Sequence, residues 1–200
     1  MKKIYILIIV SVVLNINGCA KSHSIKIIET IPSVSTPSWV NNTKEFWQDK
    51  DNFYYRGTTD GTTRIEESKR IATASARLKI AEQIRNEIKS DFIVAIQANA
   101  DTTDLYIKDI FISKVDGIVI TGSTIVESYL QKIQESTKNE KEKIYYRCYI
   151  LMQISKNDYE KTAKMAFEDT INQLADDNKI ALTQKIEKNF WGLYNTKNNK

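Results

Sequence analysis

The sequence predicts an α+β domain in which long helices pack on one face of a small antiparallel sheet of about three strands. Three features carry this prediction: an apolar repeat of period four, two segments of alternating polarity joined by a charged loop, and a further amphipathic segment after them. The resulting order of strand, helix, hairpin and helix is typical of domains whose helices cover one face of an antiparallel sheet.

The first strand is expected over residues 53–58, whose sequence FYYRGT is rich in the aromatic residues that strands favour. Asp60 and Gly61 follow it as a turn signal. A long helix is expected over residues 64–89, and residues 63–66 have the spacing of a capping box at its start. The core side of this helix is an apolar stripe of period four: Ala72, Ala76, Ile80, Ile84 and Ile88.

The middle of the chain contains a predicted hairpin. Residues 91–100 are compatible with a continued helix or a short strand, because periodicity does not separate the two in so short an apolar run, and residues 105–115 indicate a shorter helix. Strands are expected over residues 117–131 and 144–154, joined by an exposed charged loop. One face of the second strand is apolar at period two: Ile144, Tyr146, Cys148, Ile150, Met152 and Ile154.

The C-terminal part predicts a final helix. Ser155 and Asp158 lie where an N-terminal cap is expected, and apolar residues then recur at helical spacing from Tyr159 to Leu174. A second amphipathic stretch covers residues 180–194, and the polar residues 195–200 are expected to be disordered.

The N-terminus has the outline of a cleavable signal peptide. Lys2 and Lys3 precede an apolar run over residues 4–14, which is shorter than the roughly 20 residues that a membrane-spanning helix needs. The run leads to Gly18 and Cys19, which resemble the lipobox of bacterial lipoproteins. The main prediction is removal of residues 1–18 and lipidation of Cys19. The alternative is ordinary cleavage near Gly18, which leaves Cys19 as a free thiol.

The organisation that follows is a signal peptide over residues 1–18, a lipid-anchored flexible tether over 19–36, a single α+β domain over 37–194 and a tail over 195–200. The formal net charge of +4 falls when Lys2 and Lys3 leave with the signal, so no nucleic-acid partner is expected. The two cysteines exclude a disulfide framework. The predicted partner is a membrane, held through acyl chains on Cys19.

Candidate catalytic groups give no coherent site. The single histidine, His23, lies in the predicted tether, and the six glycines form no phosphate-binding loop. Cys148 is interpreted as a buried small apolar residue instead of a nucleophile. Glu66, Glu67, Asp176 and Asp177 are two pairs of adjacent carboxylates, interpreted as caps or solvated charges instead of a hydrolytic pair. No catalytic residue, metal ligand or cofactor is therefore expected.

Two aromatic groups are candidate contact surfaces. Phe53, Tyr54 and Tyr55 can stack on a ligand, but packing within the sheet is the favoured interpretation. The second group is a candidate for a partner or membrane contact, with folding back on the core as the favoured alternative; its members are Phe190, Trp191, Leu193 and Tyr194.

Several segments together are similar to the Lpp-twenty family of bacterial surface lipoproteins. They are the PSWV sequence at residues 37–40, the aromatic strand ending in Gly57, the helix IATASARLKIAEQI at 71–84 and the strand YYRCYILMQI at 145–154. The resemblance implies a lipoprotein of the outer membrane or cell surface without catalysis, and some members of the family are associated with the flagellar basal body. Ala20 after Cys19 is compatible with export to the outer membrane.

Three functions remain open at this point. The first is a non-enzymatic, lipid-anchored envelope protein with a structural or interaction role that assembles into a homo-oligomer. The second is a monomeric accessory regulator of an envelope or flagellar machine. The third is a carrier of a small ligand, with a pocket between sheet and helices lined by Tyr55, Tyr146 and Met152.

Overall fold

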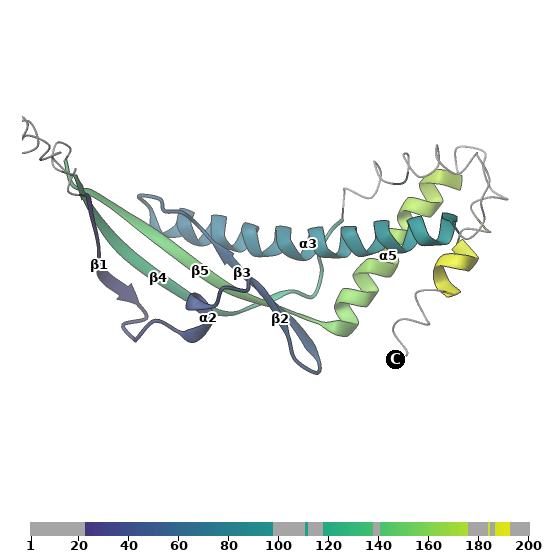
Figure 1. Ribbon diagram of the computed structural model, residues 1–200, viewed down its shortest axis with the longest axis horizontal. Coiled ribbons are helices and arrows are strands. Elements are labelled where there is room, and N and C mark those ends of the chain that lie inside the picture. Colours follow the sequence, from purple (N-terminus) through teal and green to yellow (C-terminus); the bar gives the residue numbers. More distant parts are fainter. Residues whose placement is uncertain are drawn as a thin grey trace, which may run out of the picture.

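A five-stranded antiparallel sheet and a helix of 33 residues dominate the computed structural model, which describes residues 23–97, 111, 118–137, 141–175, 184 and 187–192 (Figure 1). The α+β class predicted from the sequence is confirmed. The elements in chain order are β1 (His23–Ile31), α2 (Ser38–Asn41), β2 (Phe46–Gln48), β3 (Asn52–Thr58), α3 (Ile65–Gln97), β4 (Thr124–Thr137), β5 (Lys143–Ser155) and α5 (Lys156–Ala175).

The strands follow the order β1-β4-β5-β3-β2, and the predicted β4–β5 hairpin forms its centre. Its longest register runs from Glu127 opposite Leu151 to Glu135 opposite Lys143. β3 pairs with the other side of β5, and β1 pairs with the other side of β4. The sheet therefore has one short edge strand, β2, and one long edge strand, β1.

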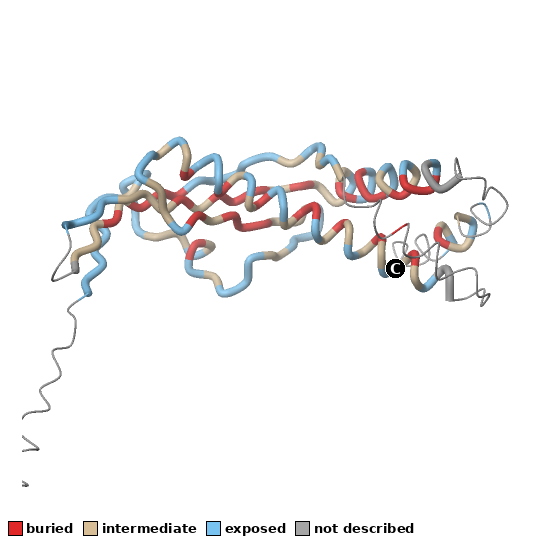
Figure 2. The backbone as a smooth tube through the Cα atoms, turned by 90° about the horizontal axis from the view of Figure 1, so that it is seen from above, coloured by how far each residue is buried: buried red, intermediate tan, exposed pale blue. Residues whose placement is uncertain are grey.

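Helix α3 covers one face of the sheet, as the period-four stripe predicts. Ala72, Ala76, Ile80, Ile84 and Ile88 are all fully buried. Figure 2 shows the buried residues along the strands and along one side of the helix. The apolar side chains of β5 lie on the face of the sheet that contacts α3. Burial of apolar side chains from both elements therefore holds the helix on the sheet.

The opposite face of the sheet is covered in part by the short helix α2. Arg56 of β3 is buried and donates hydrogen bonds from Nη1 to the carbonyl oxygens of Trp39 (3.2 Å), Val40 (2.8 Å) and Asn42. The indole Nε1 of Trp39 donates to Glu127 on β4 over 2.6 Å. These bonds attach the segment that contains α2 to β3 and to β4, the two strands that flank β5.

The C-terminal half of α3 packs beside α5 (Figure 1). Helix α5 begins where the sequence predicts a cap, since Asp158 N donates to the Ser155 hydroxyl over 3.0 Å. An aromatic cluster follows, in which Phe167 stacks on Phe190 with ring centroids 3.5 Å apart and meets the Trp191 ring edge-on at 5.3 Å. The interpretation that this terminal stretch folds back is confirmed for Phe190 and Trp191.

Four features of the fold differ from the sequence prediction. The sheet has five strands instead of about three, because β1 and the three-residue β2 add an edge on each side. Helix α3 continues to Gln97, which settles the described part of residues 91–100 as helix. β4 begins at Thr124 instead of residue 117, after Gly122 with φ of +76°. The hydroxyl contacts at the start of α3 are made by Thr62, which donates to the Arg64 carbonyl over 2.7 Å, and not by a Thr63 capping box.

The prediction of a flexible tether over residues 19–36 is wrong for His23–Ile31. Ile25 and Ile27, separated by Lys26, pair with Glu135 and Ile133 of β4, so this segment is a strand of the sheet. The predicted signal peptide, residues 19–22, the 195–200 tail and most of the 105–115 helix lie outside the described residues. Phe111 is described, and it is helical and buried.

Candidate functional site

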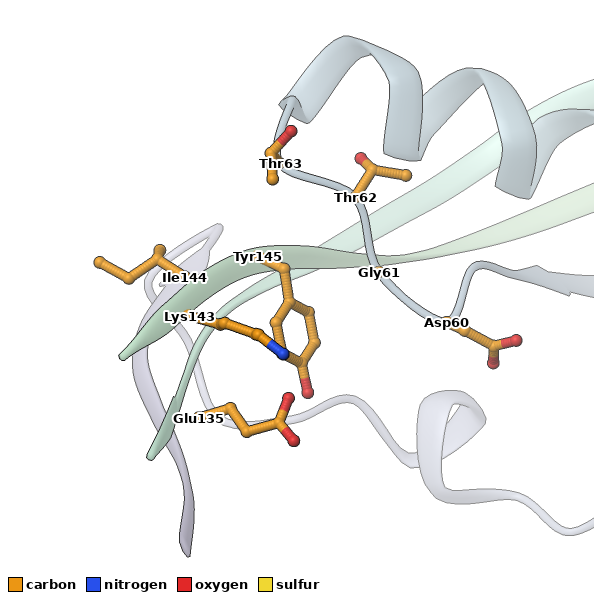
Figure 3. A pocket seen from close by; sticks show the side chains of 8 residues that line it. All are labelled: Asp60, Gly61, Thr62, Thr63, Glu135, Lys143, Ile144 and Tyr145. Atoms are coloured by element: carbon orange, nitrogen blue, oxygen red, sulfur yellow. The ribbon is translucent and has the colours of Figure 1, made fainter. Parts of the chain in front are cut away.

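The end of the sheet nearest to Cys19 in the sequence brings together β1, the β4–β5 hairpin and the loop before α3. His23 is paired with Thr137, so the first described residue lies beside the end of the hairpin. An open depression of about 490 Å³ lies at this end (Figure 3). Its lining residues come from the loop, β4 and β5: Asp60, Gly61, Thr62, Thr63, Glu135, Lys143, Ile144 and Tyr145.

The loop side of this depression is fastened to β5. Thr62 N donates to the Tyr146 carbonyl over 3.0 Å, and Tyr146 N donates to the Thr62 carbonyl over 2.7 Å. Gly61 has φ of +127°, and the ring of Tyr145 occupies the space that a Cβ at Gly61 would need, with Cε2 at 2.9 Å. Gly61 is therefore required both for its backbone conformation and for the approach of the Tyr145 ring.

One charged side chain of the depression has a partner outside it. Glu135 Oε1 lies 2.8 Å from Nε2 of His23, and the pair is exposed to solvent. Figure 3 shows Glu135, Lys143 and Tyr145 on one side and the loop residues on the other. Over the described residues, no group of three His, Cys, Asp or Glu side chains is placed to hold a metal ion.

Cys148 lies on the apolar face of β5, as predicted, and is fully buried. It belongs to a cluster with Ala72, Leu130 and Ile150 at the interface of the sheet and α3. Burial raises the pKa of its thiol to about 11, and the positive charge of Lys69 opposes this shift. A raised pKa and an inaccessible sulfur are the opposite of what a nucleophilic cysteine needs.

We expect Cys148 to resist thiol reagents in the folded protein carrying Cys19→Ala. Its pKa rises from 9.0 to about 11 on folding, so at pH 8 its thiolate fraction falls about 100-fold on that account alone. The rate of alkylation with and without urea measures this effect. Equal rates in both conditions would contradict the buried position.

Because the thiolate is disfavoured only in the folded state, this group's contribution to stability is complete below pH 9 and is lost as the pH rises to about 11.

The three residues predicted to line a ligand pocket do not share one. Tyr55 and Met152 are packed in the main core with Ile80 and Ile84, whereas Tyr146 lies against the separate cluster around Cys148. Tyr55 also borders a smaller depression of about 340 Å³ between β2 and α3, where its hydroxyl donates to Gln83 Oε1 over 2.9 Å. Burial is the main cause that raises the pKa of Tyr55.

The other sequence candidates are surface or packing residues. Glu66 is exposed and lies 3.8 Å from Lys69, an ordinary surface ion pair. Phe53 packs edge-on against Tyr159 at 4.8 Å, and Tyr54 stacks on Trp47 at 6.1 Å. The packing interpretation of the aromatic strand is confirmed. Outside the described residues lie Asp176, Asp177, Leu193 and Tyr194.

An apolar edge along β1 is the feature that the sequence analysis missed. Of the thirteen large apolar side chains that are exposed among the described residues, five lie in one short segment. Their exposed fractions are 55% for Ile25, 48% for Ile27, 39% for Ile28, 45% for Ile31 and 53% for Val34. Apolar alternation at residues 25 and 27 was a usable signal, but Ile28 interrupts it with a register shift between Ile27 and Glu29.

No helix within the described residues combines the length and apolarity needed to cross a membrane. No protein-family model, curated protein or solved structure matches this chain.

Proposed function

We propose that this protein is a lipid-anchored lipoprotein of the cell envelope, located at the outer membrane, with a non-enzymatic structural or interaction role. The observation that carries the proposal is the N-terminal sequence, in which two lysines and an apolar run lead to Gly18 and Cys19. The resemblance to the Lpp-twenty lipoproteins points in the same direction.

The position of β1 supports this proposal. Only three residues separate Cys19 from His23, where the sheet begins. At about 3.3 to 3.6 Å per residue, the Cα atoms of Cys19 and His23 are at most about 14 Å apart. An acyl chain on Cys19 therefore holds one end of the sheet at the bilayer surface. The depression in Figure 3 lies at this same end.

The absence of convergent polar groups in the described depressions favours an interaction role over an enzymatic one. A carrier role has less support, because Tyr55 and Met152 are core residues and Tyr146 belongs to a separate cluster. Self-assembly and regulation of an envelope or flagellar machine remain proposals. The mass and composition of the native particle distinguish these two functions. Self-assembly predicts a homo-oligomer, and regulation predicts a complex with a different protein.

We expect Cys19→Ala to abolish membrane attachment. Each buried methylene of an acyl chain contributes about 0.8 kcal/mol, so two or three chains anchor a protein in effect irreversibly. Wild type should fractionate with the outer membrane and carry acyl groups at Cys19 by mass spectrometry, while the variant should be released in soluble form. The matched control is Cys148→Ala, which should remain attached. An unacylated wild-type Cys19 would refute the proposed anchor.

A further inference from the structure

We infer that β1 lies edge-down on the bilayer surface, with the exposed aliphatic side chains of residues 25–34 inserted at headgroup level. This inference rests on the proposed lipid anchor at Cys19 and adds a second, protein-mediated contact with the same membrane. It also fixes an orientation, because contact along the whole of β1 lays the sheet's long direction parallel to the bilayer.

The exposed apolar residues of the β1 segment are placed to contact a surface with the edge of the sheet and not with one of its faces. Ile25 and Ile27 lie opposite Glu135 and Ile133, on the face of the sheet away from α3. Ile31 lies opposite Leu130, which is on the α3 face. Side chains from both faces can reach one flat surface only if the edge strand itself rests on that surface. The exposed Ile28 lies at the register shift between these two groups.

The backbone of β1 sets the depth of this contact. Over the described residues β1 is the terminal strand, so the backbone groups on its outer side have no neighbouring strand. Such groups are costly in hydrocarbon but are satisfied by water and headgroups at the interface. Lys26, exposed on the same strand, can extend its ammonium toward lipid phosphates. The expected contact is therefore interfacial and shallow.

A second copy of the chain is the competing occupant of an exposed edge strand. Two features of β1 oppose strand pairing between copies: the bulge between Ile27 and Glu29, and the charged residues Lys26 and Glu29 on the strand. Bulges and edge charges are the devices by which proteins prevent edge-to-edge association. The bilayer, in contrast, is held within about 14 Å of His23 by the tether length.

The test uses the acylated full-length protein in vesicles of phosphatidylethanolamine and phosphatidylglycerol whose acyl chains carry bromine. A bimane label is attached at Ile31→Cys, near the end of β1 far from Cys19. A second label position is Ile28→Cys, in case the first variant folds poorly. The matched control is Leu78→Cys on α3, whose native side chain is 53% exposed against 45% for Ile31. The buried Cys148 and the acylated Cys19 should not react with the label.

We expect the label on β1 to lose about half of its fluorescence, since apolar groups of interfacial segments enter roughly 5–10 Å into the headgroup and acyl boundary. The label at Leu78→Cys should keep its fluorescence. Equal fluorescence at both positions would overturn the inference, as would energy transfer between labelled β1 strands without bromine quenching, which would indicate a second copy. Quenching on β1 in a protein whose Cys19 carries no lipid would refute the anchor alone.

Discussion

Gly57→Ala is expected to destabilise the domain by about 3 kcal/mol or more, a large effect for one methyl group. A Cβ at Gly57 would overlap the Ala72 carbonyl oxygen and lie 2.6 Å from the Ala76 backbone nitrogen and 2.8 Å from its Cβ. The first two are backbone atoms of α3, so no side-chain rotation relieves the contact. Helix and sheet must separate, and the apolar layer between them then loses contacts along its length.

The matched control for this prediction is Gly192→Ala, where an added Cβ meets nothing within 4 Å. Gly192 lies in a described helical segment, so alanine should be neutral or stabilise the protein by up to about 1 kcal/mol. Urea unfolding of the Cys19→Ala protein followed by circular dichroism measures both changes. A Gly57→Ala midpoint within error of the parent would show that α3 and β3 are not in such close contact.

The close contact at Gly57 also shows which parts of the fold were accessible from sequence. The period-four stripe, which includes Ala72 and Ala76, identified the buried side of α3 correctly. The alternation of β5 and the Ser155 cap of α5 were equally local signals, and both are confirmed. Each depends on residues within a few positions of one another.

The elements that were missed depend on partners far away in the chain. β1 is polar at five of its nine positions and contains a bulge, and it becomes a strand by pairing with β4, about 100 residues later in the chain. β2 has three residues and exists through its pairing with β3. Local patterns carry little information about such pairings, because the stabilising hydrogen bonds come from another segment. The prediction of a tether over residues 19–36 was wrong at residues 23–31 for this reason.

The same limit applies to the candidate site. The predicted lipidation of Cys19 comes from a linear motif and stays a prediction. The buried position of Cys148 followed from strand alternation and is confirmed. The alternation at residues 25 and 27 was a local signal for a strand, but the position of β1 at the edge of the sheet follows only from its pairing with β4. The depression beside it combines residues 60–63 with residues 135 and 143–145, which only the register of the hairpin and the loop brings together.

Arg56→Met should lower the free energy of unfolding by about 1–3 kcal/mol, the range found when a buried hydrogen-bonding group loses its partner. Methionine retains much of the apolar stem but none of the donors, so the carbonyl oxygens of Trp39, Val40 and Asn42 lose their shared partner. The Arg56 side chain is also 4.0 Å from Glu45 Oε1, so this carboxylate loses a neighbouring positive charge. Lys79 Nζ, 2.8 Å from Glu45 Oε2, remains and limits that part of the loss.

In the Arg56→Met variant we expect the α2 segment to unfold first, because Arg56 joins that segment to β3. Trp39 should become more accessible to a soluble quencher such as acrylamide at urea concentrations below the main unfolding transition. Arg70→Met is the control: Arg70 is exposed on α3, and its loss should change stability by no more than about 0.5 kcal/mol. If Arg56→Met unfolds at the same midpoint as Arg70→Met, water satisfies the three carbonyl oxygens. The packing of the α2 segment on the sheet then does not depend on the guanidinium group.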